Sequence, residues 1–326
     1  MLERPRRNRK SETIRNMVRE TQVSLTSLIY PVFMIDGRDK KIPISSMPGI
    51  YRWSPDTLLH EIEACMNVGI HSFVLFPALD DSLKDSHATY SYSKENFYLQ
   101  SIRAIKQRFP ECCLVSDVAM DPYSSDGHDG FVENGKIIND KSLPILSRMA
   151  VAQAEAGIDI IGPSDMMDGR VAHIREALDV AGFVDTSIMS YTAKYASAFY
   201  GPFRDALDSA PKFGDKKTYQ MNPANKREAL READADTAEG ADFLMVKPAL
   251  CYLDIIHLLK ENSNLPIAAY NVSGEYAMLK AAAEKGWIQY ERAMPEVLLS
   301  IQRAGADVIL TYFAKEYAEL VKAGLA

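Results

Sequence analysis

The sequence predicts an α/β protein built as a (β/α)8 TIM barrel, and two observations carry this prediction. A pattern of helix end, glycine and short apolar strand recurs four times, and four more apolar runs lie between the repeats, which gives eight strands in about 300 residues. The runs are apolar without alternation, as is typical of parallel strands covered on both faces. A doubly wound open sheet is the alternative, but the chain has neither a G-x-G-x-x-G nor a P-loop signature.

The predicted elements follow one another in chain order. The repeats are MNVGIHSFVLFP (66–77), AEAGIDIIGPSD (154–165), AEGADFLMVKP (238–248) and RAGADVILTYF (303–313). Their glycines are the expected left-handed stops of the preceding helices. The other strands are predicted at 27–35, 112–120, 187–192 and 266–272. Helical patterns that separate neighbouring strands lie at 56–68, 94–109 and 225–240.

Two segments fall outside the alternation of strands and helices. Residues 129–139, DGFVENGKIIN, predict a small hairpin that turns at Asn134-Gly135. Residues 1–23 form a polar, Arg-rich arm with little to bury. No linker divides the remainder, so we expect an N-terminal arm (1–23) and one barrel domain (24–326).

Composition narrows the possible functions. The 326 residues carry a net charge of −7, which argues against nucleic acid as a partner, although RPRRNRK in the arm keeps a nucleic-acid-binding protein as the non-enzymatic alternative. No apolar run approaches the roughly 18 residues of a membrane span, and the N-terminus lacks the apolar region of a secretory signal. The four cysteines form no C-x-x-C pair, which favours free thiols in a reducing cytoplasm.

Polar side chains follow the predicted strands, where the active sites of such barrels lie. They are Asp117, Ser164, Asp165, Lys194, Lys247, Ser273 and Tyr312. Lys194 and Lys247 end the fifth and sixth strands, about 4.8 Å apart in a parallel sheet, so their charges should repel. Repulsion and desolvation both lower the pKa of a lysine, and a neutral amine is the nucleophile of Schiff-base chemistry.

Each lysine has a simpler explanation as well. The lysine of DFLMVKPAL (242–250) at a strand end could reach solvent and serve no chemistry. A class I aldolase-type lyase also uses an imine on a barrel lysine, but it would employ only one of the two amines. A pair of lysines on adjacent strands favours chemistry that needs both.

Long motifs in order along the chain resemble one known family. They are RPRRNR (4–9), SDVAMDPYSSDGHDG (116–130), GPSDMMDGRV (162–171), YTAKYASAFYGPFRDA (191–206), FGDKKTYQMNPAN (213–225), GADFLMVKPALCYLDI (240–255), NVSGEYAM (271–278) and GADVILTYFA (305–314). From about Arg4 to the C-terminus the chain resembles the δ-aminolevulinic acid dehydratase (porphobilinogen synthase) family. The resemblance implies a cytoplasmic barrel enzyme, usually a homo-octamer, whose N-terminal arm wraps a neighbouring subunit.

The resemblance also implies the reaction and the residues that perform it. Two 5-aminolevulinate molecules condense to porphobilinogen with loss of two waters, an early step of tetrapyrrole synthesis. Lys247 is the implied Schiff-base lysine and Lys194 its partner. The implied substrate-binding residues are Arg204, Lys216 and Gln220 for one carboxylate, Ser273 and Tyr312 for the other, and Asp117 and Ser164 for an amino group. Surface charge for Arg204 and Lys216, aromatic packing for Tyr312 and helix capping for Ser273 are the alternatives.

The metal expected from the resemblance depends on three positions. Many members of the family bind catalytic zinc through three cysteines, and the matching positions here are Ala119, Asp121 and Asp129. Without a thiolate we expect no catalytic zinc; whether the two aspartates hold a hard cation, act as acid–base groups or are solvated loop residues stays open. Relatives of the magnesium type carry an allosteric Mg²⁺ on a glutamate that matches Glu232, although a solvated helix face would also explain this residue.

Overall fold

Eight parallel strands close into a barrel in the computed structural model, which describes residues 2–207 and 212–325. The strand order is β12-β11-β10-β9-β8-β5-β4-β1, and β12 also pairs with β1, so the sheet has no open edge within the ring. The strands are β1 (Leu28–Ile35), β4 (Ser72–Ala78), β5 (Cys113–Val115), β8 (Ile160–Ile161), β9 (Ser187–Lys194), β10 (Phe243–Lys247), β11 (Ile267–Asn271) and β12 (Val308–Thr311). The predicted (β/α)8 barrel is confirmed.

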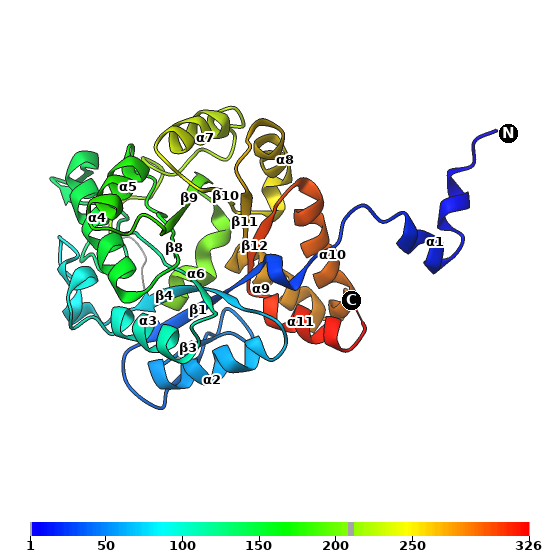
Figure 1. Ribbon diagram of the computed structural model, residues 1–326, viewed down its shortest axis with the longest axis horizontal. Coiled ribbons are helices and arrows are strands. Elements are labelled where there is room, and N and C mark those ends of the chain that lie inside the picture. Colours follow the sequence, from blue (N-terminus) through cyan, green and yellow to red (C-terminus); the bar gives the residue numbers. More distant parts are fainter. Residues whose placement is uncertain (1, 208–211, 326) are drawn as a thin grey trace.

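Helices surround the ring of strands (Figure 1). Those of the barrel are α2 (Pro55–Met66), α3 (Phe97–Arg108), α4 (Asn139–Ala156), α5 (Arg170–Val180), α7 (Glu228–Ala238), α8 (Leu253–Asn262), α9 (Ser273–Glu284), α10 (Tyr290–Ala304) and α11 (Ala314–Lys322). The four repeat glycines, Gly69, Gly157, Gly240 and Gly305, all have positive φ between 98° and 120°. They therefore end their helices as the repeat predicts, and the chain turns directly into a buried strand.

The third strand, β5, is shorter than the predicted run 112–120, and the fourth, β8, is only the two residues Ile160–Ile161 after the predicted glycine stop. Beyond β5 and β8 the two segments still pair at the isolated bridge between Val118 and Pro163, where Val118 N–H donates to the carbonyl of Gly162 and Ser164 N–H donates to the carbonyl of Val118. The backbones crowd here, since a Cβ on Gly162 would lie 2.5 Å from the carbonyl oxygen of Ser116. The pairing thus extends past the two short strands as far as Ser164, and Asp117 and Ser164 both line the cavity at the barrel mouth.

Two hairpins extend the barrel. The predicted one is present as β6 (Val132–Glu133) and β7 (Lys136–Ile137), with positive φ at Asn134 and Gly135 as its tight turn requires. The other was not predicted: β2 (Lys41–Pro43) pairs antiparallel with β3 (Tyr51–Trp53), and β3 adds to the sheet beside β1.

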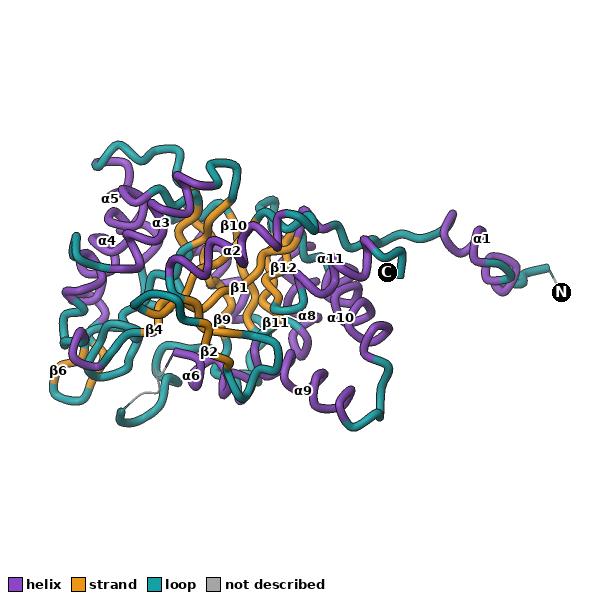
Figure 2. Tube along the Cα trace, turned by 90° about the horizontal axis from the view of Figure 1, so that it is seen from below, coloured by secondary structure: helices purple, strands orange, loops and turns teal. Residues whose placement is uncertain are grey.

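One short helix, α6 (Gly201–Leu207), differs from the others in position. It lies inside the ring of strands in Figure 1 and beyond one end of the strands in Figure 2, so it covers one mouth of the barrel. This is the mouth formed by the carboxyl ends of the strands, since α6 follows the end of β9.

The N-terminal segment projects away from the barrel (Figures 1 and 2). It contains a 3-10 helix, η1 (Pro5–Arg9), and α1 (Glu12–Met17), and neither buries a residue within this chain. All four cysteines are free thiols. Among the described residues, no helix is both long enough and apolar enough to cross a membrane.

Candidate active site

Two lysines end neighbouring strands and face the same mouth. Lys194 closes β9, Lys247 closes β10, and the two are partners across the parallel strands. The pairing shifts by one residue between Leu244 and Val246; without this irregularity Lys247 would lie opposite Ala193. Because successive side chains of a strand point to opposite faces, the shift places both lysines on one face. Each residue is only 6% exposed.

Lys194 belongs to a cluster of two ammonium and two carboxylate groups. Its Nζ lies 3.1 Å from Oδ2 of Asp129 and donates to the backbone carbonyl of Ser164. Lys216 donates to the other oxygen of Asp129 and to Asp121 Oδ2 at 3.0 Å. Burial alone would raise the pKa of Asp129, but the two lysines outweigh it and lower this pKa to about 2. Asp129 is therefore a carboxylate shared by the two lysines, whereas burial raises the pKa of Asp121.

Lys247 has an aromatic environment instead. The ring centroids lie 4.6 Å from its Nζ for Tyr270, 5.0 Å for Tyr191 and Phe203, and 5.4 Å for Tyr200. Burial lowers the pKa of Lys247 to about 7, and repulsion by Lys194 acts in the same direction. Near neutral pH a large fraction of Lys247 is therefore the free amine, which is the form that attacks a carbonyl carbon.

Asp117 faces both lysines from the irregular segment after β5. Burial raises its pKa to about 7, and the charge of Asp121 adds to the increase, while Ser164 and the two lysines oppose it. Its Oδ1 is buried without a hydrogen-bond partner among the described residues. An unsatisfied buried oxygen is costly, so this atom is suited to receive a donor from a ligand.

Seven of the predicted site residues line one small cavity. Its lining is Asp117, Asp121, Ser164, Lys194, Tyr200, Phe203, Arg204, Lys216, Gln220 and Lys247. The cavity volume of about 30 Å³ holds one or two water molecules. The mouth is thus closed around its reactive groups in this structure, with α6 as part of the wall.

Ser273 and Tyr312 lie outside this lining. The hydroxyl of Tyr312 is 3.0 Å from that of Tyr270 within the aromatic interior of the barrel. Ser273 accepts a hydrogen bond of 2.9 Å from the backbone N–H of Phe203 in α6. The cap of α9 is Val272, whose N–H donates to Glu275 at 3.0 Å, so Ser273 does not cap the helix. Ser273 instead connects the start of α9 to α6.

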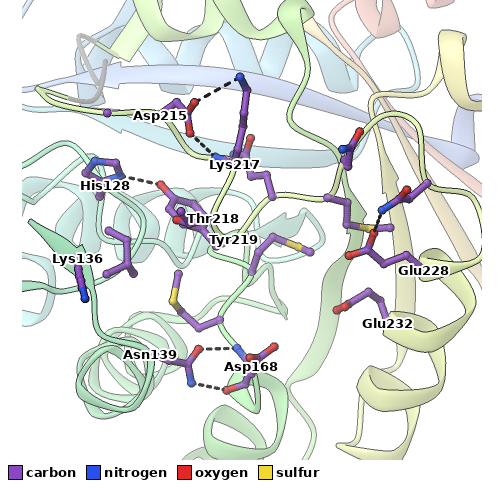
Figure 3. Close-up of a pocket in the computed structure, with 18 of the residues that line it drawn as sticks. His128, Lys136, Asn139, Asp168, Asp215, Lys217, Thr218, Tyr219, Glu228 and Glu232 are labelled. Carbon is purple, nitrogen blue, oxygen red and sulfur yellow. Dashed lines mark hydrogen bonds and ion pairs between the residues drawn. The ribbon is translucent and has the colours of Figure 1, made fainter.

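Glu232 lies away from the lysines, in a second and larger pocket of about 930 Å³ (Figure 3). The pocket lies between the β6–β7 hairpin, residues 213–222 and α7, and Gln220 borders both it and the small cavity. Burial raises the pKa of Glu232; Arg170 opposes this increase, while nearby acidic residues, Asp168 and Glu228 among them, add to it. A hard cation that keeps its water ligands would relieve this crowding of negative charge.

A zinc site does not fit the mouth. Ala119 is buried and offers no ligand, and the carboxylates of Asp121 and Asp129 are engaged by Lys216 and Lys194. Across the described residues, no group of three or more His, Cys, Asp or Glu side chains is arranged to hold a metal ion. The donor set of the mouth therefore suits protonated amines rather than a tightly bound metal.

Sequence reasoning missed the aromatic cage and the part played by Asp129. Tyr191 and Tyr270 lie inside the predicted strands, and Phe203 lies one residue before Arg204 in the quoted motif. An aromatic residue within an apolar strand, or next to an arginine in the sequence, gave no signal of contact with Lys247. Asp129 reaches Lys194 and Lys216 only through a loop whose path the sequence does not specify.

Comparisons with known proteins agree on one relationship. Residues 2–320 match the model of the family described as Delta-aminolevulinic acid dehydratase. The chloroplastic delta-aminolevulinic acid dehydratase of Oryza sativa subsp. japonica is 55% identical over 324 residues, which are 98% of this chain and 76% of that protein. The enzyme of Bradyrhizobium diazoefficiens is 53% identical over 320 residues, 98% of this chain and 91% of that one. A Toxoplasma gondii delta-aminolevulinic acid dehydratase (porphobilinogen synthase), solved with its product porphobilinogen, superimposes with a TM-score of 0.96 at 54% identity, over 98% of this chain and 91% of the other.

Proposed function

The chain belongs to the delta-aminolevulinic acid dehydratase family, and from this premise we propose how its residues perform the reaction. The enzyme condenses two 5-aminolevulinate molecules to porphobilinogen with loss of two waters, in tetrapyrrole biosynthesis. The observation that carries the proposal is the contrast between Lys247, whose pKa is lowered to about 7 by burial, and Lys194, which forms an ion pair with Asp129; the two are partners across adjacent strands.

Lys247 is the first nucleophile. The lone pair of its amine attacks the keto carbon of one substrate, the carbonyl oxygen takes up a proton, and a carbinolamine forms. Loss of the hydroxyl as water then gives the protonated imine, which withdraws electrons and acidifies the neighbouring C–H. Burial supports this order, because it lowers the pKa of Lys247 to about 7 and leaves a large fraction of the amine uncharged before substrate arrives.

Lys194 acts first as the charged partner. Its ammonium is fixed by Asp129 and the carbonyl of Ser164, so it is positioned to donate a proton to the departing hydroxyl. An imine at Lys194 with the second substrate requires this proton to leave, and we therefore place it after the imine at Lys247.

The polar wall holds the ends of the substrates. Arg204 and Lys216, with Gln220, bind one carboxylate, for which a guanidinium offers a fork and an ammonium a point charge. The unsatisfied oxygen of Asp117, beside Ser164, receives the amino group of a substrate. Ser273 and Tyr312 remain the proposed partners of the other carboxylate; for Ser273 this requires release of its bond to α6.

Borohydride trapping tests the lysine assignment. Reduction during turnover with 5-aminolevulinate should leave a mass adduct on the peptide that contains Lys247, and a weaker one on the peptide with Lys194. A control with 5-aminolevulinate omitted should give none. Absence of an adduct on Lys247 in an active sample would overturn the assignment.

We also propose an allosteric Mg²⁺ at Glu232. The residue supplies one carboxylate in a wide pocket with further acidic groups nearby, which suits a cation that retains most of its waters. Bound there, Mg²⁺ supplies local charge compensation and no part of the bond chemistry. No catalytic zinc is proposed, and free thiols support a reducing compartment such as the cytoplasm.

The arm supports a further proposal, a homo-oligomer, usually octameric in this family. Its apolar side chains Leu2, Met17 and Val18 are 95%, 79% and 51% exposed, although burial would stabilise them. We propose that they pack on a second copy of the chain. Deletion of residues 2–23 should give smaller particles by analytical ultracentrifugation, and an unchanged particle size would refute the role of the arm.

A further inference from the structure

The helix α6 carries two walls of the catalytic cavity but is too short to be stable alone. Its Phe203 lies against Lys247, and its Arg204 lines the same cavity. A helix of seven residues is well below the length at which isolated helices form in water. The contacts at its two ends therefore decide whether it stays over the mouth.

The amino end of α6 is held by α9. The N–H of Phe203 donates to Ser273, and the preceding 3-10 helix η5 (Ala198–Tyr200) packs directly on the backbone of Gly274. A Cβ on Gly274 would lie 2.5 Å from the carbonyl oxygen of Phe199, so this approach requires glycine.

The carboxyl end is held by an arginine from the unpredicted hairpin. Arg52 of β3 donates through Nε to the carbonyl of Ala206 at 2.5 Å and through Nη2 to the carbonyl of Asp205. The last carbonyls of a helix have no partner within it and carry its negative dipole end, so a guanidinium there is favourable.

The register of β3 against β1 positions Arg52 for its contact with the carboxyl end of α6. Arg52 pairs with Phe33 of β1, and the ring of Phe33 packs 5.6 Å from that of Phe203. The strand that carries the arginine is thereby fixed to the strand that supports the underside of α6. No residue of the β2–β3 hairpin is among the described residues that line the catalytic cavity, so Arg52 acts on the cavity only through α6.

We propose that Arg52 is a positioning residue that holds α6 closed over Lys247, and that it touches no reacting atom. The inference rests on the proposed role of Lys247. With Arg52 removed, α6 spends more time away from the mouth. Arg204 then leaves its place beside the substrate, and water reaches the amine of Lys247.

The expected signature has two parts. The KM for 5-aminolevulinate should rise about tenfold or more, because Arg204 is displaced. The acidic limb of kcat/KM should move to higher pH, since hydration favours the ammonium form of Lys247 and the departing positive charge of Arg204 no longer opposes it. The groups that face Lys247 and do not move with α6 are Lys194, Asp117, Asp121, Asp129, Lys216, Tyr191 and Tyr270.

The experiment compares three variants of the full chain. Arg52→Met keeps the length of the side chain and removes the donors, while Arg52→Lys keeps a cation and should recover part of the KM. Lys41→Met is the control on the same hairpin, since Lys41 packs over Tyr51 and Trp53 and makes no bond to α6. KM, kcat, the pH profile, the melting temperature and the borohydride adduct on Lys247 are measured for each.

A raised KM and a shifted acidic limb in Arg52→Met, a partial return in Arg52→Lys and no change in Lys41→Met would support the inference. An equal rise of KM in Arg52→Met and Lys41→Met would overturn it. A lower melting temperature of Arg52→Met with an unshifted pH profile would also overturn it. If Arg52→Met does not fold, an unchanged KM in Arg52→Lys overturns it instead. Failure to trap Lys247 in the unmodified enzyme would count against the proposed chemistry. Normal trapping together with an unchanged KM and pH profile in Arg52→Met would count only against the role proposed for Arg52.

Discussion

The two sides of the barrel mouth give a buried lysine opposite environments, carboxylates on one side and aromatic rings on the other. On the carboxylate side, Lys194 and Lys216 form ion pairs with Asp121 and Asp129, and the two lysines lower the pKa of Asp129 to about 2. On the aromatic side, Lys247 has rings for neighbours and a pKa lowered to about 7. The lysines are partners in one register, so backbone position does not distinguish them. Their surroundings alone distinguish the two amines, and the proposed mechanism uses this difference when it gives nucleophilic attack to Lys247 and proton donation to Lys194.

The comparison predicts its largest effect for Lys247→Met. Activity and borohydride trapping should be lost, yet the melting temperature at pH 7 should rise. The unfolded chain keeps the ordinary lysine pKa of 10.5, so between pH 7 and 10.5 it binds more protons than the folded chain. The free energy of unfolding of the unmodified enzyme should then increase with pH by up to roughly 1.4 kcal/mol per unit, a slope that the variant lacks. Calorimetry at pH 7 and 9 checks this, and a variant less stable than its parent at pH 7 would contradict it.

Asp129→Asn should have the next largest effect, on the carboxylate side. Two buried ammonium groups lose a shared anion, which costs about 3 kcal/mol of stability. The charge of Asp129 also raises the pKa of Lys247, so its removal should move the acidic limb of kcat/KM to lower pH, opposite to the change expected for Arg52→Met. Asp215→Asn, in an exposed pair with Lys217, is the control. A limb that moves upward would show that the two sides are not coupled through charge.

The smallest effect is expected outside both sides, at Glu232. Glu232→Gln should lose the response to Mg²⁺, measured both as stimulation and as a shift of melting temperature, while Lys247 is still trapped by borohydride. Glu176→Gln on the exposed face of α5 is the control. If Asp121→Asn abolishes the response and Glu232→Gln does not, the metal belongs to the mouth and the proposed location is wrong.

The barrel was predictable because its repeat is strong. Four glycine stops and eight two-sided apolar runs give strand number and order, and order alone makes β9 and β10 neighbours. Because β9 and β10 are adjacent, the sequence predicts that Lys194 and Lys247, which end these strands, lie close together. The elements that the sequence did not predict depend on tertiary contacts: β3 is three residues long and pairs with β1 through two of them, and α6 is stabilised by contacts from other elements. The aromatic cage is of this kind too, because Phe203 approaches Lys247 only once α6 is folded over the mouth.

The irregularity between β9 and β10 has a consequence for the inheritance of the site. Between Leu244 and Lys247 the partner strand contains one residue more than its neighbour, from Ser190 to Lys194. The proximity of the two amines therefore depends on the number of residues between these positions in each strand. A change in that number cannot be compensated by substituting a side chain. A single-residue deletion in that interval would keep both lysines, the barrel and the sequence motifs largely recognisable, but would turn one lysine toward the helices. Alignment gaps at this place are thus a sharper sign of lost chemistry in a distant homologue than the identity of any one side chain.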